Sequence, residues 1–237
     1  LYAKGEKPDA VIDFPVSATD YEAVDIFNWQ EEAEGMISQM EFVRRVDASS
    51  ETVEKYIREG TIIPDLIVPM SEHRTFKYFS EETLNKTAEK FGWRLISDDN
   101  RKQLFMEMIQ QMDMSYSYKP VLIEAIFANA DSKGRIKLDD IVSYFRNYYE
   151  SRRKNGLTVE KANSIFAKGG YTDKEAQRNI LSNPFKRFED MQMLRHTRTL
   201  GIVEVEPTVW KALDKKEKQE ILRICEEKLY GYFRRLG

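Results

Sequence analysis

Basic side chains are the residues of this chain whose types and grouping best suit binding chemistry. Residues 132–200 hold 15 basic and 8 acidic side chains, whereas residues 1–35 hold 2 basic and 9 acidic ones. Lysine and arginine bind phosphate oxygens, so the basic centre favours a nucleic-acid partner, and the acidic head favours a basic protein face. Ordinary solvated surfaces carry similar charge runs, which is the alternative interpretation. The candidate nucleic-acid-binding residues are Ser50, Lys55, Arg58, His73, Arg74, Lys77, Arg152, Arg153, Lys186, Arg187, Arg195 and Arg198.

The chain lacks the residue patterns that nucleotide hydrolysis and zinc binding require. The chain has no G-x-x-x-x-G-K-[ST] run, whose backbone N–H groups would cradle phosphates. One cysteine, Cys225, and two histidines, His73 and His196, lie far apart in the sequence, without the spacing of zinc ligands. Cys225 falls on the apolar face of an expected helix, where a thiol is inert. We therefore expect no metal and no cofactor.

Two acidic segments could suit metal-dependent chemistry, but neither has the right surroundings. Lys133 and Arg135 stand where a calcium loop beginning at Asp131 would need oxygen ligands, so a turn is favoured there. The paired carboxylates of Asp139 and Asp140 would suit a nuclease if they stood on a strand, but they open an expected helix, where acids stabilise the helix dipole. We therefore expect no catalytic residue in this chain.

The elements expected in residues 36–95 would place the first basic residues on a helix and a wing. Ser38 begins a capping box, Ser49 or Ser50 is expected to cap a second helix, and Gly60 ends that helix. Two short strands and a polar loop should follow, and Ser80 should cap a further helix. The predicted ranges are 51–59 and 81–91 for the helices, 61–64 and 75–79 for the strands, and 69–74 for the loop.

The segment 56–64, Tyr-Ile-Arg-Glu-Gly-Thr-Ile-Ile-Pro, resembles the junction between recognition helix and wing in MerR-type and excisionase-type winged helices. Arg74, Tyr78 and the run 80–84 resemble the arginine of that wing, its aromatic residue and the start of the next helix. The resemblance implies a winged helix-turn-helix that contacts duplex DNA. The helix departs from typical DNA readers in one respect, because it carries Glu51, Glu54 and Glu59 against only two basic residues.

Residues 96–237 are expected to form a helical domain that contains a second winged-helix-like module. The predicted order is a helix over 120–130, a strand over 135–138, a helix capped by Asp139, a capping box at Thr172, a helix over 185–191 begun by Asn183 and Pro184, a hairpin around Gly201 and a closing helix over 214–236. The segments 117–122, 144–146 and 183–189 resemble a C-terminal segment of bacterial DEAD/DEAH helicases, including the motor subunits of restriction systems. That resemblance implies an accessory region of such a protein.

Composition sets the outer limits of these hypotheses. The chain of 237 residues is 41% hydrophobic and 12% aromatic, enough for real cores, and no window of eighteen residues is apolar and uncharged. A single cysteine permits no internal disulfide and suits a reducing compartment, so we expect a cytoplasmic protein. A start at Leu1 instead of methionine suggests a piece of a longer protein. We expect an acidic lead-in or docking segment over 1–35, a winged helix-turn-helix module over 36–95 and a helical domain over 96–237.

The sequence therefore predicts a mainly α fold with small β hairpins, in which helices join two winged-helix-turn-helix-like modules. The expected function is non-catalytic binding of double-stranded DNA, and assembly, within a restriction-type or helicase-type protein. The alternatives are a protein-docking module that links the motor to methylase or specificity subunits, and a stand-alone MerR-like transcription regulator. Replacing Arg74 and Lys77 by alanine should weaken DNA binding and flatten its salt dependence by about one unit for each phosphate contact that the variant removes.

Overall fold

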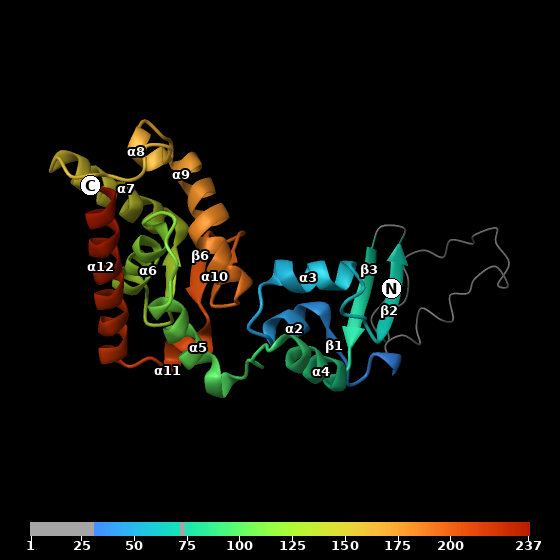
Figure 1. Cartoon of the computed structure of the whole chain (residues 1–237). Helices are drawn as coiled ribbons and strands as arrows, with labels where there is room; N and C mark the ends of the chain where they lie inside the picture. Colours follow the sequence, from blue (N-terminus) through green and yellow to red (C-terminus); the bar gives the residue numbers. More distant parts are fainter. Residues whose placement is uncertain (1–30, 72–73) are drawn as a thin grey trace, which may run out of the picture.

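The computed structural model describes residues 31–71 and 74–237 of the chain, with the side chains of Ser71 and Arg74 left aside. The strand expected within 9–16, most of the helix expected within 19–34, and His73 lie outside the described residues. Figure 1 shows two units next to each other along the molecule, joined by the segment between α4 and α5.

The first unit is a small three-stranded antiparallel sheet with three helices. Its elements are β1 (Ile37–Ser38), α2 (Gln39–Arg44), α3 (Ser50–Arg58), β2 (Leu66–Ser71), β3 (Arg74–Phe79) and α4 (Glu81–Phe91). The strand order is β1-β3-β2, so the last strand lies in the middle. Ser38, Ser49 and Ser80 cap the helices as expected, each accepting a bond from a backbone N–H three residues on. The core of this unit includes Phe42 and Phe79.

The strand predicted over 61–64 is wrong, because this stretch closes α3 instead. Gly60 has a positive φ of 71°, and the N–H groups of Thr61 and Ile62 both donate to the carbonyl of Tyr56. Ile62 is thereby buried in the core while Ile63 stays exposed. The first wing strand is β2, whose residues 69–71 fall in the stretch predicted as a loop. Its pairing with β3 shifts register between Pro69 and Ser71. The predicted strand over 75–79 is confirmed as β3.

The second unit packs helices around another three-stranded antiparallel sheet, with strand order β4-β6-β5. Its first elements are α5 (Asp98–Gln110), α6 (Tyr118–Asn129), β4 (Arg135–Lys137), α7 (Leu138–Lys154), α8 (Ile165–Lys168) and α9 (Asp173–Ile180). They are followed by the π-helical turn η2 (Leu181–Phe185), α10 (Lys186–Asp190), β5 (Leu194–Thr197), β6 (Ile202–Val205), α11 (Pro207–Ala212) and α12 (Lys215–Leu236). The capping box predicted at Thr172 is present, and Asp214, the first residue of the predicted closing helix, forms another.

Three predicted helix starts differ from the structure. Pro184 does not begin a helix: it lies inside η2, which joins α9 to α10 without a break. A π-turn suits this position because proline has no N–H to donate to the preceding turn. Leu138, one residue before Asp139, begins α7, with Lys137 at the cap. Tyr118 begins α6, two residues before Pro120, which remains in the first turn where its missing N–H costs nothing.

The two units share part of their order of elements, although the second unit has more helices before and after its first strand. In each unit a first strand is followed by helices and then by a hairpin, and the last strand of the hairpin pairs with the first strand. The fold is therefore mainly α with small antiparallel sheets of three strands, as predicted. Within the described ranges, none of the helices combines the length and the apolar character that a membrane span requires.

A buried polar network fixes the loop after α7 inside the second unit. The carboxylate of Glu160 accepts bonds from the backbone N–H of Ser117 at 2.8 Å, from the Ser117 hydroxyl at 2.5 Å and from the Tyr232 hydroxyl. The Ser117 hydroxyl also lies 2.7 Å from the Tyr149 hydroxyl. Buried carboxylates are tolerated when they are fully bonded in this way. Ser117 is thus a structural residue in this fold.

Candidate nucleic-acid interface

The helix expected to read DNA in the first unit, α3, has its N-terminal end turned toward the second unit. Ser50 is its first residue, and the Ser50 hydroxyl donates to Asp190 Oδ1 in α10 at 2.8 Å. Lys55 lies 4.0 Å from the carboxylate of Glu59, and Arg58 is exposed at the end of the helix. Figure 1 shows α3 and α10 facing each other across the junction between the units.

The wing of the first unit is more apolar than basic. Lys77, on β3, is half-buried beside a groove between this strand and α2 and α3. Arg74 is placed only as the first residue of β3. Ile63, Ile67 and Met70 expose 71%, 53% and 45% of their surface on or next to this wing. Exposed apolar side chains in a group are typical of protein contact surfaces.

Arg152 and Arg153, predicted as a cationic cluster, are committed to contacts within the fold. The Arg152 Nε donates to the carbonyl of Thr158 at 2.8 Å, and its guanidinium lies 3.3 Å from the ring centroid of Phe233. Arg153 donates to the carbonyl of Phe166 at 2.7 Å and forms an ion pair with Glu150 at 3.1 Å. Both side chains stabilise the segment that follows α7, and they are poorly placed to reach a ligand.

The two predicted cations of α10 have different surroundings. Lys186 forms an ion pair with Asp190 at 2.6 Å, and this hydrogen-bonded partner raises the pKa of the Lys186 ammonium. Arg187 is exposed, and among the described residues no carboxylate lies within ion-pair distance of it. The helix predicted to read DNA in the second unit therefore offers Arg187 to a ligand, whereas Asp190 at its end is occupied by Ser50 and Lys186.

The outer face of the second sheet brings together cations from three separate segments. In the strand register, Arg135 and Arg195 both stand opposite Glu204, and Lys137 stands opposite Ile202. Paired residues of an antiparallel ladder point to the same side of the sheet, so these side chains share one face. Lys133 and Arg198 lie in the turns at the two ends of this sheet. We call the group of Lys133, Arg135, Lys137, Arg195 and Arg198 the basic sheet face.

Two carboxylates offset part of the charge of the basic sheet face. Asp131 forms an ion pair with Arg135 at 3.2 Å, and its carboxylate also accepts bonds from the backbone N–H groups of Lys133 and Arg135. These bonds, from Arg135 first, lower the pKa of Asp131. Glu204 is the second carboxylate, on the middle strand. The face retains an excess of positive charge, and Lys137, Arg195 and Arg198 form no ion pair inside the described ranges.

Sequence reasoning found Arg195 and Arg198 but missed Lys133, Arg135 and Lys137. These three lysine and arginine residues alternate along the turn and strand over 133–137, a period that places them on one side of a strand. The alternation is visible in the sequence, but only the pairing of β4 with β6 brings it next to the hairpin.

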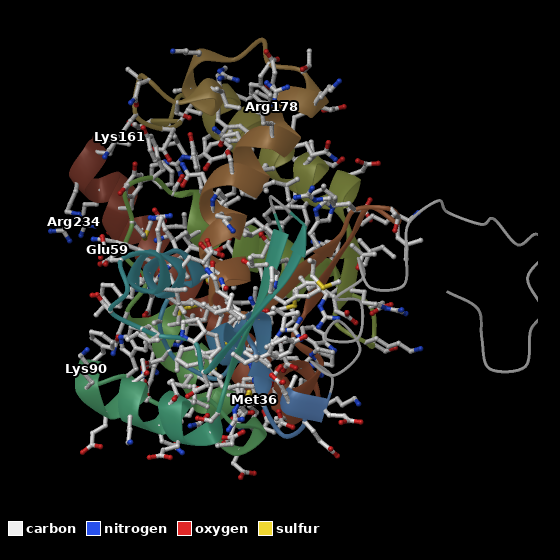
Figure 2. All side chains as sticks on the ribbon, turned by 90° about the vertical axis from the view of Figure 1, so that its right-hand side faces the viewer. Met36, Glu59, Lys90, Lys161, Arg178 and Arg234 are labelled. Carbon is white, nitrogen blue, oxygen red and sulfur yellow. The ribbon has the colours of Figure 1, made fainter. Side chains whose placement is uncertain are left out.

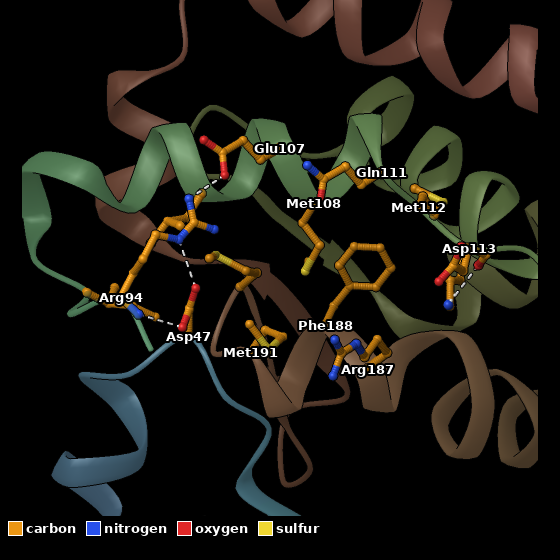
Figure 3. Close-up of a pocket in the computed structure, with 14 residues that line it drawn as sticks. Asp47, Arg94, Glu107, Met108, Gln111, Met112, Asp113, Arg187, Phe188 and Met191 are labelled. Carbon is orange, nitrogen blue, oxygen red and sulfur yellow. Dashed lines mark hydrogen bonds and ion pairs between the residues drawn. The ribbon is translucent and has the colours of Figure 1, made fainter. Parts of the chain in front are cut away.

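A cavity of about 280 Å³ lies at the junction between the units (Figure 3). Arg94 spans one side of it, donating to Asp47 in the first unit at 2.8 Å and to Glu107 in α5 at 2.5 Å. Lys119 and Arg187 also line the cavity. Burial, and then the neighbouring charge of Arg187, lowers the pKa of the Lys119 ammonium.

No group of three or more histidine, cysteine or carboxylate side chains in the described part of the chain is arranged to hold a metal ion. Comparison with protein-family models, with curated proteins and with solved structures finds no match to this chain.

Proposed function

We propose that this chain is a non-catalytic DNA-binding and assembly region of a larger restriction-type or helicase-type protein, and that it contacts duplex DNA through the basic sheet face. The observation that carries the proposal is the convergence of five cations on the outer side of the β4-β6-β5 sheet and its turns. A hairpin wing that presents lysine and arginine is suited to phosphate oxygens along a groove.

The contacts of α3 and α10 favour binding that does not depend on DNA sequence. The N-terminal end of α3 is bonded to Asp190, and the Lys186 side chain of α10 is paired with the same carboxylate. Helices read base edges when they enter the major groove, and these contacts engage the N-terminal end of α3 and the Lys186 side chain, so that Arg187 is the exposed cation left on α10. Phosphate contacts alone position a protein on DNA without selecting a sequence.

Protein docking is the second candidate function, and the first wing favours it. Its exposed Ile67 and Met70 offer an apolar contact, and Glu51, Glu54 and Glu59 place negative charge along the neighbouring helix. A methylase or specificity subunit, or the motor domain of the same protein, would be the partner. In the combined proposal, the second unit contacts DNA and the first unit binds the partner protein.

Fluorescence anisotropy of labelled duplex DNA, titrated at several salt concentrations, tests the proposal. The variant Lys137→Ala/Arg195→Ala/Arg198→Ala should bind more weakly than the parent chain. The slope of log K against log salt should fall by about one unit for each phosphate contact that the variant removes, up to about three. Duplexes of unrelated sequence should bind with dissociation constants that agree within about threefold, because phosphate contacts do not select a sequence. A difference of 1.4 kcal/mol in binding free energy would already change the dissociation constant tenfold.

The matched control is Lys154→Ala/Lys168→Ala/Lys174→Ala, which removes the same charge from three exposed lysines outside the basic sheet face. Lys154 ends α7, Lys168 ends α8 and Lys174 lies in the first turn of α9. This control should keep most of the affinity. Equal losses in the two triple variants would contradict the assignment to the basic sheet face. Strong preference for one duplex would favour the stand-alone regulator, and an absence of binding at low salt would favour the docking function.

A further inference from the structure

Seven of the fourteen side chains that line the cavity at the junction of the units are apolar, and four of these are methionines. Met108, Met112, Met191 and Met193 line it together with Phe188, from α5, from α10 and from the segments that follow these helices. Figure 3 shows Met108, Phe188 and Met191 in the middle of the lining, between Arg94 at one side and Arg187 at the other. Methionine side chains are flexible and polarisable, so such walls adapt to an aliphatic or aromatic group. Small-molecule sites typically combine walls of this kind with a few polar groups.

The polar groups of the cavity are unequally neutralised. At one side, Arg94 is paired with the two carboxylates of Asp47 and Glu107. At the other side, Lys119 and Arg187 lie close enough for their charges to interact. The Lys119 Nζ donates to the backbone carbonyl of Asp113 at 2.8 Å, and neither cation has an ion pair with a carboxylate of the described residues. Asp113 also lines this side, and its carboxylate is close enough to act on the Lys119 ammonium. This side of the cavity therefore carries two cations against one carboxylate, an excess of positive charge that a bound anion would neutralise.

We propose that this cavity binds a small organic anion with an apolar body, of the class of medium-chain or aromatic carboxylates, with its anionic group between Lys119 and Arg187 and its body among the methionines. A volume of about 280 Å³ accommodates a body of this size. The inference is independent of the DNA-binding proposal, because the basic sheet face contributes none of these residues.

Methyl NMR of protein labelled at the methionine methyl groups, titrated with sodium octanoate, tests the proposal directly. The methyl signals of Met108, Met112, Met191 and Met193 should shift together and saturate. The signals of Met70, exposed on the first wing, and Met36, at the start of the first unit, should stay in place. Shifts confined to methionines outside the cavity, or no saturable shift up to millimolar octanoate, would overturn the proposal.

Charge recognition is tested by Lys119→Gln/Arg187→Gln, which should weaken octanoate binding at least tenfold while the spectrum otherwise remains that of the folded chain. Octanol, which has the same body without the charge, should bind the parent chain at least tenfold more weakly than octanoate. The control is Arg178→Gln, an exposed arginine on α9 that is labelled in Figure 2 and does not line the cavity. Unchanged octanoate affinity in the double variant, or equal loss in the control, would refute the assigned anion site.

Discussion

Two buried glutamates show how individual residues of this chain use their surroundings. Glu160 is fully bonded by Ser117, Tyr232 and the N–H of Lys161, and so remains a satisfied acceptor inside the second unit. Glu124 is equally buried on α6, but the hydrogen bond that it accepts from the Tyr144 hydroxyl is long, at 3.4 Å. Burial, and then the nearby carboxylate of Glu226, raises the pKa of Glu124 to about 7. The first glutamate stabilises the fold, whereas the second makes stability depend on pH.

Replacing Glu124 by glutamine should remove that dependence. The folded state holds the Glu124 proton more tightly than the unfolded chain, so this group lowers the free energy of unfolding as pH rises from about 4.5 to about 7. The stability of Glu124→Gln relative to the parent chain should therefore increase by roughly 2 kcal/mol between pH 4.5 and pH 8. Urea denaturation at the two pH values measures it. Glu89→Gln, on the exposed face of α4, should show no such change, and a flat result for both variants would refute the assignment.

The boundaries of the helices and strands in this chain are determined mainly by the residues at their ends. Serine, threonine and aspartate caps begin α2, α3, α4, α9 and α12, and these starts were predictable because a side-chain oxygen satisfies an otherwise free N–H. Pro184 was misleading, because proline also occurs within a π-turn. The start of β4 depends on the turn at Gly134, whose φ is 79° and whose carbonyl accepts a bond from Val205.

Gly134→Ala should therefore destabilise the second sheet strongly. A Cβ at this position would lie 2.7 Å from the indole of Trp210, in addition to the strain of a positive φ. We expect a decrease of about 3 kcal/mol in the free energy of unfolding, from steric overlap and backbone strain together. Gly156→Ala is the matched control, because its φ is 66° but no heavy atom lies within 4 Å of the added Cβ. That control should be destabilised by about 1 kcal/mol in chemical denaturation; similar decreases in both variants would show that the contact with Trp210 is unimportant.

The junction between the two units covers the N-terminal end of α3 and contains the cavity. Ser50 bonds to Asp190, Arg44 Nε lies 3.4 Å from Gln192 Oε1, and Arg94 links Asp47 to Glu107. The side chain of Ile96, in the link, is buried with the core of the second unit. These contacts set which surfaces remain exposed, namely the basic sheet face, the first wing and the acidic side of α3.

Replacing Arg94 by alanine should loosen this junction without unfolding either unit. The carboxylates of Asp47 and Glu107 would no longer share a partner, and the backbone around Trp93 and Leu95 would open more often. Limited proteolysis with chymotrypsin should cleave after these residues several times faster than in the parent chain. Lys86→Ala, which breaks an ion pair confined to α4, is the control and should leave the cleavage rate unchanged. An unchanged rate in Arg94→Ala would show that the ion pairs do not hold the units together.

The amino-acid sequence by itself determined the mainly α class, the second hairpin, the capped starts of α2, α3, α4, α9 and α12 and the candidate cations Arg195 and Arg198, because caps, glycine stops and side-chain periodicity act over a few residues. Only the tertiary structure decided the availability of those cations. It joined Lys137 to Arg195 and Arg198 through strand pairing, committed Arg152 and Arg153 to internal carbonyls, and bonded Ser50 to a carboxylate 140 residues away. The physical reason is that the charge available to a ligand depends on which neighbours neutralise it, and those neighbours come from distant parts of the chain.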